Sequence, residues 1–230
     1  MIGTLVWGFL FAAHLHAAEK PAAGAAPQAE VAVLAGVAMR FADSGDDPDE
    51  IGYRPGVQLI VQGRGYVWSW LNAAIYHRRA HHQIDIPRGA AGMDYEHMDK
   101  DSVLAYSLGA RFEPTYRIMD SVRVFAIVGI GWGKLNMGRI HVQESARSYM
   151  VRDRSGVFVE IPLGLGLAYE VIPRWLAIQA EVDVSPFWKQ SGGVHGTSPY
   201  TDSDGILGSV GPMPMQTHSA SFLFGVSLLL

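Results

Sequence analysis

The strongest constraint on the fold is a two-residue alternation of side-chain character that recurs along the chain. Within residues 157–171 every charge falls at one parity, at Glu160 and Glu170, and the other parity is apolar. Successive side chains of a β-strand point to opposite faces, so this period indicates a strand with one apolar and one mixed face. The apolar parity consists of Val157, Val159, Ile161, Leu163, Leu165, Leu167 and Tyr169.

Eight segments show this alternation, and we predict each to be a strand. They lie at about 30–41, 55–63, 66–79, 102–113, 120–133, 157–171, 174–185 and 216–230. In the segment at 66–79 either parity could be the apolar face, and a β-bulge within it would reconcile its two halves. The chain is therefore predicted to be all-β.

The connections between these segments alternate in length. Tight turns are predicted near 63–65, 113–119 and 171–173, and long polar loops are predicted at 42–53, 80–101, 134–156 and 187–215. Consecutive strands joined in this way are antiparallel neighbours, with short turns at one end and long loops at the other. This pattern predicts an eight-stranded, antiparallel, up-and-down barrel.

The composition excludes several classes of protein. Of the 230 residues 49% are apolar, but the mean hydropathy is only +0.11 and no apolar run reaches the roughly 18 residues that a spanning helix needs. The 18 basic residues form no stripe and the net charge is −4, so we expect no nucleic-acid partner. The absence of cysteine excludes disulfides and thiolate metal sites.

The N-terminal residues have the pattern of a targeting segment. Residues 1–13 form an apolar run of signal-peptide length, and Ala17 and Ala18 offer a cleavage site before Glu19. We predict a signal peptide at 1–18, a flexible linker at 19–28 and the barrel at 29–230. A buried N-terminal helix is the alternative.

The parity of the charges predicts what surrounds the barrel. Arg or Lys on the lipid face near the bilayer midplane costs about 2–4 kcal/mol, so a membrane barrel holds its charges inside, whereas a soluble barrel is polar outside. The charges opposite the apolar faces, which we assign to a lumen network, are Arg40, Arg111, Arg123, Glu160, Glu170, Glu181 and Asp183. The residues assigned to the lipid face are Val159, Ile161, Leu163, Leu165, Leu167, Phe222, Phe224, Val226, Leu228 and Leu230.

Aromatic residues cluster near the predicted strand ends, as in the two interfacial girdles of membrane barrels. The girdle at the turns is predicted to contain Tyr66, Trp68, Phe112, Tyr116, Tyr169 and Trp175. The girdle at the loops is predicted to contain Phe41, Tyr53, Tyr76, Trp132, Phe187 and Trp188. The core of a soluble sandwich is the alternative for these aromatics.

The last strand carries a resemblance to a known family. Residues 221–230 place Phe222, Phe224, Val226, Leu228 and Leu230 on one face, similar to the C-terminal signal of outer-membrane proteins, with Leu230 where that family usually has Phe. From Glu30 onward the architecture resembles the eight-stranded OmpA/OmpX-type outer-membrane β-barrel superfamily. The resemblance implies a transmembrane barrel in the bacterial outer membrane with short periplasmic turns and long extracellular loops. It also implies contact with outer-membrane lipids and recognition of the last strand by the barrel-assembly machinery.

Side chains just fill the bore of an eight-stranded barrel, so the inward charges are expected to pair and plug it. We predict a non-enzymatic protein whose loops serve envelope integrity, adhesion or surface interaction with an unknown partner. The alternative is a small ion channel or a barrel that binds a small ligand.

Two further functions are less favoured by the sequence. Lipid A deacylases resemble such barrels but use a His-x-Ser pair on one strand face, whereas here His218 is followed by Ser219 on the opposite face and Ala220 on its own. Imidazole and carboxylate side chains gather near residues 80–101, but their spacing matches no structural zinc pattern, so no metal and no cofactor are predicted. These side chains are His77, His81, His82, Asp94, Glu96 and His97.

Overall fold

The computed structural model describes residues 29–42, 52–85, 96–97, 102–144, 147–151, 153–196, 198–202, 204–205, 207–210 and 215–230. The predicted signal peptide and linker lie outside these residues. Within this part of the chain, no helix is long and apolar enough to cross a bilayer.

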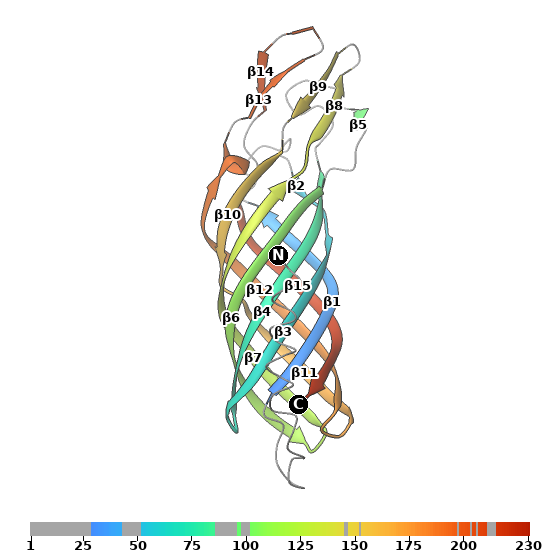
Figure 1. Ribbon diagram of the computed structural model, residues 1–230, viewed down its shortest axis with the longest axis vertical. Coiled ribbons are helices and arrows are strands. Elements are labelled where there is room, and N and C mark those ends of the chain that lie inside the picture. Colours follow the sequence, from blue (N-terminus) through green and yellow to red (C-terminus); the bar gives the residue numbers. More distant parts are fainter. Residues whose placement is uncertain are drawn as a thin grey trace.

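The described chain forms a long barrel of tilted antiparallel strands (Figure 1). Each barrel strand pairs with its neighbours in sequence, and the last strand closes the ring by pairing with both the first strand and the one before it. The barrel strands are β1 (Ala29–Ala42), β3 (Gly56–Trp68), β4 (Leu71–Asp85), β6 (Ser102–Met119), β7 (Val122–Met137), β10 (Arg154–Glu160), β11 (Leu163–Ile172), β12 (Leu176–Gly192) and β15 (Gln216–Leu229). The predicted fold class is confirmed.

β10 and β11 are two parts of one barrel strand, which gives eight strand positions in the ring. On β7, Glu160 pairs with Gly131 and Leu163 pairs with Val128, so the register continues unchanged across the gap. Pro162 lies in the gap and has no N–H to donate, but its carbonyl accepts a hydrogen bond from the N–H of Gly129 at 3.0 Å. The interruption is therefore local to the proline.

Two of the three predicted tight turns are wrong. The chain turns at residues 69–70 and 120–121, whereas residues 63–65 and 113–119 are strand. Gly63 pairs with Val31 on one side and Ile75 on the other, because a glycine inside a paired strand need not turn. Pro114 likewise lies within β6, opposite Leu71. The third turn is at residues 173–175, two residues later than predicted, with Arg174 at φ 64°.

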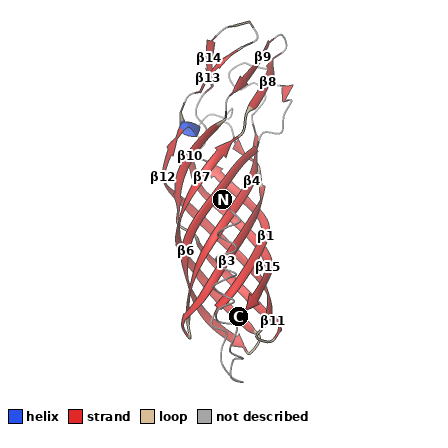
Figure 2. Cartoon of the chain, in the orientation of Figure 1, coloured by secondary structure: helices blue, strands red, loops and turns tan. Residues whose placement is uncertain are grey.

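The strands also extend into the predicted loops. Beyond the barrel wall lie short elements: β2 (Gly52–Tyr53), β5 (Glu96–His97), β8 (Ile140–Glu144), β9 (Arg147–Val151), the 3₁₀ turn η2 (Gly193–His195), β13 (Ser198–Thr201) and β14 (Leu207–Val210). β8 and β9 form one hairpin and β13 and β14 another, and both project beyond one end of the barrel (Figure 2). We call this end the loop end, and the end with residues 69–70, 120–121 and 173–175 the turn end.

The strands are longer than predicted for a physical reason, which residues 134–137 at the end of β7 illustrate. Here Leu135 and Met137 are buried inside, whereas Lys134 is exposed and Asn136 is partly exposed outside. An apolar outer face is required only where the wall meets lipid, so a search for apolar outer faces ends strands too early.

The segment at 66–79, whose parity the sequence left undecided, contains the end of β3, a turn and the start of β4. From Leu71 onward, Asn72, Tyr76 and Arg78 face inward and are buried, whereas Ile75 is exposed on the outside. A register irregularity falls between Tyr66 and Trp68, where β3 pairs with β4. The two halves of the segment therefore belong to different strands, which is why no single parity fitted them.

Candidate functional site

The lumen near the turn end contains a buried network of ion pairs, which we call the first network. Arg64 contacts Glu30 at 2.5 Å from Nη1 to Oε1 and also pairs with Glu113. Arg111 donates from Nε to Glu113 Oε1 and from Nη2 to Glu181 Oε1, both at 2.6 Å. These charges are almost fully buried. Such burial is tolerable only because each charge has a partner.

Arg123 completes the first network from β7. Its guanidinium pairs with Glu30 on β1 and also donates to the hydroxyl of Tyr66. β7 and β1 are four positions apart in the eight-position ring in either direction. The pair therefore joins opposite walls of the barrel. Arg64, Arg111 and Arg123 balance Glu30, Glu113 and Glu181, so the first network is electrically neutral.

A second network lies further toward the loop end and is centred on Arg78 of β4. Its Nη2 donates to Asp183 Oδ1 at 3.0 Å and its Nη1 to Glu160 Oε2 at 3.3 Å. Tyr76 and Ser107 also donate to Glu160 Oε1, at 2.9 Å and 2.6 Å. β4 and β12, which carries Asp183, are again opposite strands. Ion pairs thus cross the bore at two levels.

Arg40 differs from the other lumen arginines. It is buried near the loop end of β1, and its Nη1 donates to Gln216 Oε1. Its guanidinium carbon lies 5.3 Å and 5.0 Å from the ring centroids of Phe158 and Phe187, within cation–π range. Among the described residues, no carboxylate forms an ion pair with Arg40.

The structure brings five of the seven residues assigned to the lumen into these two networks: Arg111, Arg123, Glu160, Glu181 and Asp183. Arg40 is buried but belongs to neither of the two networks. Glu170 lies at the turn end, where it pairs with the half-exposed Arg117 at 3.6 Å and accepts a hydrogen bond from the N–H of Arg174 at 3.2 Å. It therefore belongs to the rim and not to the buried networks.

Four charged residues of the two networks were not found from the sequence: Glu30, Arg64, Arg78 and Glu113. Glu30 shares the inward parity of Arg40 and could have been assigned from that signal. Arg64 and Glu113 fell within the predicted turns, and Arg78 lay in the segment of undecided parity. The misplaced turns therefore account for Arg64 and Glu113, and the undecided parity accounts for Arg78.

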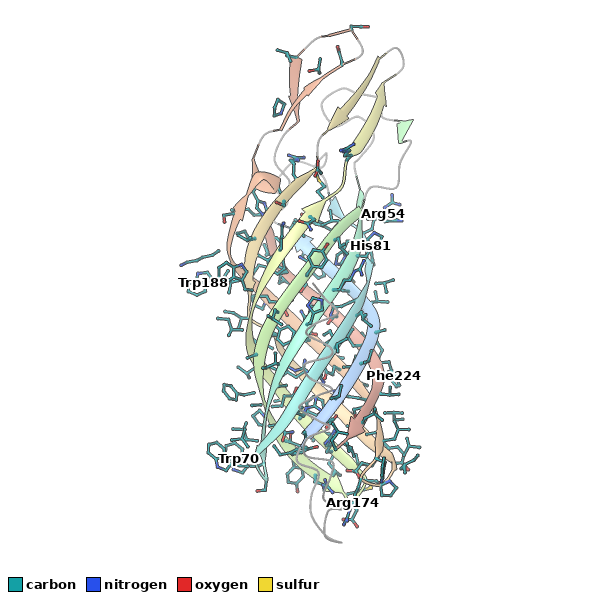
Figure 3. The ribbon with its side chains drawn as sticks, viewed as in Figure 1. Arg54, Trp70, His81, Arg174, Trp188 and Phe224 are labelled. Carbon is teal, nitrogen blue, oxygen red and sulfur yellow. The ribbon has the colours of Figure 1, made fainter. Side chains whose placement is uncertain are left out.

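The residues assigned to the lipid face lie on the outside of the barrel. Eight of them are exposed, and Val159 and Ile161 are partly exposed. The eight are Leu163, Leu165, Leu167, Phe222, Phe224, Val226, Leu228 and Leu230. Figure 3 shows Phe224 pointing away from the wall, as do Trp70 near the turn end and Trp188 toward the loop end.

The aromatic girdles were only partly predicted. Trp68, Phe112, Tyr116, Tyr169, Trp175, Phe41, Trp132 and Trp188 are exposed on the outer wall. Tyr76 is instead buried and donates to Glu160, and the hydroxyl of Tyr66 donates to Glu30 at 3.2 Å. Phe187 lies against Arg40. These three rings have the inward parity, so placing aromatics by distance from a strand end alone was wrong for them.

Within the described part of the chain, the histidines form no metal site, and Asp94 and the side chains of Glu96 and His97 lie outside it. His81 is exposed on the outer wall whereas His82 is buried, and the described residues contain no group of three His, Asp or Glu that could hold a metal. The ring of His218 stacks on Phe41 with centroids 4.4 Å apart, whereas Ser219 is buried. His218 and Ser219 therefore lie on opposite faces of β15.

No protein-family model matches the chain, and no curated protein sequence matches it. Among solved structures, Neisserial surface protein A is 13% identical with a TM-score of 0.50, and the match covers 90% of this chain and 99% of that one. A major outer membrane protein from Thermus thermophilus is 12% identical with a TM-score of 0.51, covering 88% and 99%. The attachment invasion locus protein Ail of Yersinia pestis is 12% identical with a TM-score of 0.45, covering 88% and 99%. The chain has the fold of an eight-stranded outer-membrane β-barrel.

Proposed function

We propose that this protein is a closed, non-enzymatic barrel of the bacterial outer membrane that anchors extracellular hairpins for contact with a partner at the cell surface. The observation that carries the proposal is the pair of buried networks that cross the bore. They make the lumen a filled core and leave the loop end to carry the protein's specificity.

The chemistry of the bore argues against conduction. An ion crossing the barrel would have to displace Arg123 from Glu30 and then Arg78 from Asp183, each pair joining opposite walls. Breaking one buried pair by removing a partner costs about 3–5 kcal/mol, which is a large penalty for each passage. The proposed protein is therefore sealed at rest.

The outer wall fits a lipid environment. Apolar side chains such as Leu165, which is 69% exposed, and Phe222, which is 56% exposed, would meet water in a soluble protein. In a bilayer they contact outer-membrane lipids, and the exposed Trp68 and Trp175 sit where a periplasmic girdle belongs. Assembly through β15 by the barrel-assembly machinery and export with a cleaved signal peptide are parts of the same proposal.

The surface role is assigned to the hairpins β8/β9 and β13/β14, which project from the loop end (Figure 1). Leu207 of β14 is 79% exposed there. Loops held by a rigid barrel are the common site of binding in such architectures.

Single-channel recording in planar bilayers tests the closed lumen. We expect the refolded full-length protein to give no steady conductance. A variant that removes charges at both crossings, Arg78→Ala with Arg123→Ala, is expected to show transient openings if it folds, because both cross-bore pairs are lost. Steady ohmic conductance by the unaltered protein would contradict the proposal.

The surface role needs a separate measurement. Intact cells that express the protein are treated with protease, and fragments are mapped after extraction of the membrane. Cleavage within residues 138–153 or 193–215 with the barrel strands protected is expected. Cleavage only after the cells are broken open would place the hairpins inside the cell and refute the assigned orientation.

A further inference from the structure

The loop end of the lumen contains buried hydrogen-bond donors that the two networks do not use. Arg40 is 6% exposed, and within the described part of the chain its Nε has no hydrogen-bond partner. The hydroxyl of Tyr53 and the Nε2 of Gln216 are also buried there, and within the described residues their only hydrogen-bond partners are each other. Buried polar groups are normally fully satisfied, so spare N–H and O–H donors gathered in one place call for an explanation.

These three groups belong to one cluster, which we call the mouth cluster. The Oε1 of Gln216 accepts a hydrogen bond from Arg40, so the amide N–H groups of Gln216 point away from Arg40 Nη1. The side chain of Tyr53 forms a hydrogen bond with that of Gln216 and interacts electrostatically with Arg40 and with Arg154. The three residues come from β1, β2 and β15, so the fold assembles them from distant parts of the sequence.

Among the described residues, no carboxylate forms an ion pair with the guanidinium of the mouth cluster. Glu160 interacts electrostatically with Arg40, but it already accepts hydrogen bonds from Arg78, Tyr76 and Ser107. The rings of Phe158 and Phe187 hold the guanidinium in place without neutralising it. A buried cation fixed in this way is a preorganised site for negative charge.

We propose that the mouth cluster binds a small oxoanion, with a carboxylate, phosphate or sulfate group accepting hydrogen bonds from Arg40 Nε, Tyr53 Oη and Gln216 Nε2. Guanidinium and amide donors of this kind match the oxygen geometry of such groups. The anion enters from the loop end, because Arg40 lies two residues before the end of β1 and Gln216 is the first residue of β15. The second network blocks it from passing further.

Isothermal titration of the refolded full-length protein with inorganic phosphate, and separately with sulfate, tests the proposal. The protein is held in uncharged detergent micelles, and chloride keeps the ionic strength constant. We expect saturable binding of one anion per chain. Arg40→Gln should weaken it at least tenfold, whereas Arg117→Gln, which alters a half-exposed arginine at the other end of the barrel, should leave it unchanged.

Tyr53→Phe provides a second variant that removes one hydroxyl and no charge. It should weaken binding about tenfold to a hundredfold, the loss expected for one hydrogen bond to a charged group. Heat-modifiable migration on gels verifies that each variant is folded. Should Arg40→Gln fail to fold, the binding measured for Tyr53→Phe is the test of the proposal. Absence of saturable binding by the unaltered protein, or equal binding by the folded variants, would overturn the proposal. If a carboxylate of the chain itself occupied the mouth cluster, the unaltered protein would show no saturable anion binding.

Discussion

The first network and the mouth cluster show two ways in which one barrel buries arginine. In the first network Arg64, Arg111 and Arg123 face an equal number of carboxylates, and their guanidinium groups form ion pairs within the lumen. In the mouth cluster Arg40 has two aromatic rings and one amide. A balanced network fills the bore, whereas an arginine that has no ion-pair partner among the described residues is suited to binding an anion.

The largest expected effect comes from removing an arginine of the first network, in which the charges are balanced. Arg111→Ala removes one of the two arginine partners of Glu113 and the closer arginine partner of Glu181, so three buried carboxylates would share Arg64 and Arg123. We expect the free energy of unfolding to fall by about 3–5 kcal/mol, because uncompensated buried charge is costly. Denaturant unfolding in micelles measures this, with Arg117→Ala as the exposed control expected to change by about 0.5 kcal/mol or less. Equal effects at the two arginines would show that the network is not buried.

The outer wall offers the next largest effect. Leu165→Arg places a charge on the exposed face of β11, and it should lower stability by about 2–4 kcal/mol in a bilayer if the site lies near the midplane. Leu207→Arg is the matched control, since Leu207 is exposed beyond the barrel wall and should tolerate the change. Unfolding of both variants in lipid vesicles makes the comparison. A tolerated charge at position 165 would mean that this face does not contact lipid.

The smallest effect is expected at the mouth cluster. Arg40→Met removes a buried cation without leaving any described carboxylate unpaired, and the thioether can still pack between Phe158 and Phe187. Loss of the cation–π contacts and relief of the buried charge oppose each other, so stability should change by about 1 kcal/mol or less. The same denaturant measurement applies. A loss as large as that at Arg111 would show that Arg40 belongs to a balanced ion-pair network after all.

The sequence predicted the parity of the strands better than their ends. Along β1 and β10/β11 the apolar and charged parities are those of the outer wall and the lumen, because a continuous pairing register keeps side chains alternating even past Pro162. Turns were predicted at 63–65 and 113–119 because the apolar alternation was interrupted there, and these ranges include Gly63 and Pro114. Both residues are held in strands by pairing with neighbouring strands, which is a non-local effect.

The partners within the lumen could not be read from the sequence for a related reason. Arg123 and Glu30 are 93 residues apart and meet only because β7 and β1 are opposite strands at the same height. An error in one turn moves a residue such as Arg64 out of the lumen altogether. The networks therefore depend on the register of the whole barrel and on no local motif.

The most direct test of the account is a double-mutant cycle between Arg123 and Glu30, whose contact joins opposite walls of the lumen. Unfolding free energies are measured for Arg123→Met, Glu30→Gln, the double variant and the unaltered protein. We expect the sum of the two single losses to exceed the loss in the double variant, with a coupling energy of about 1–3 kcal/mol. Additivity within about 0.5 kcal/mol would mean that the two side chains do not meet, and it would contradict a bore closed by ion pairs.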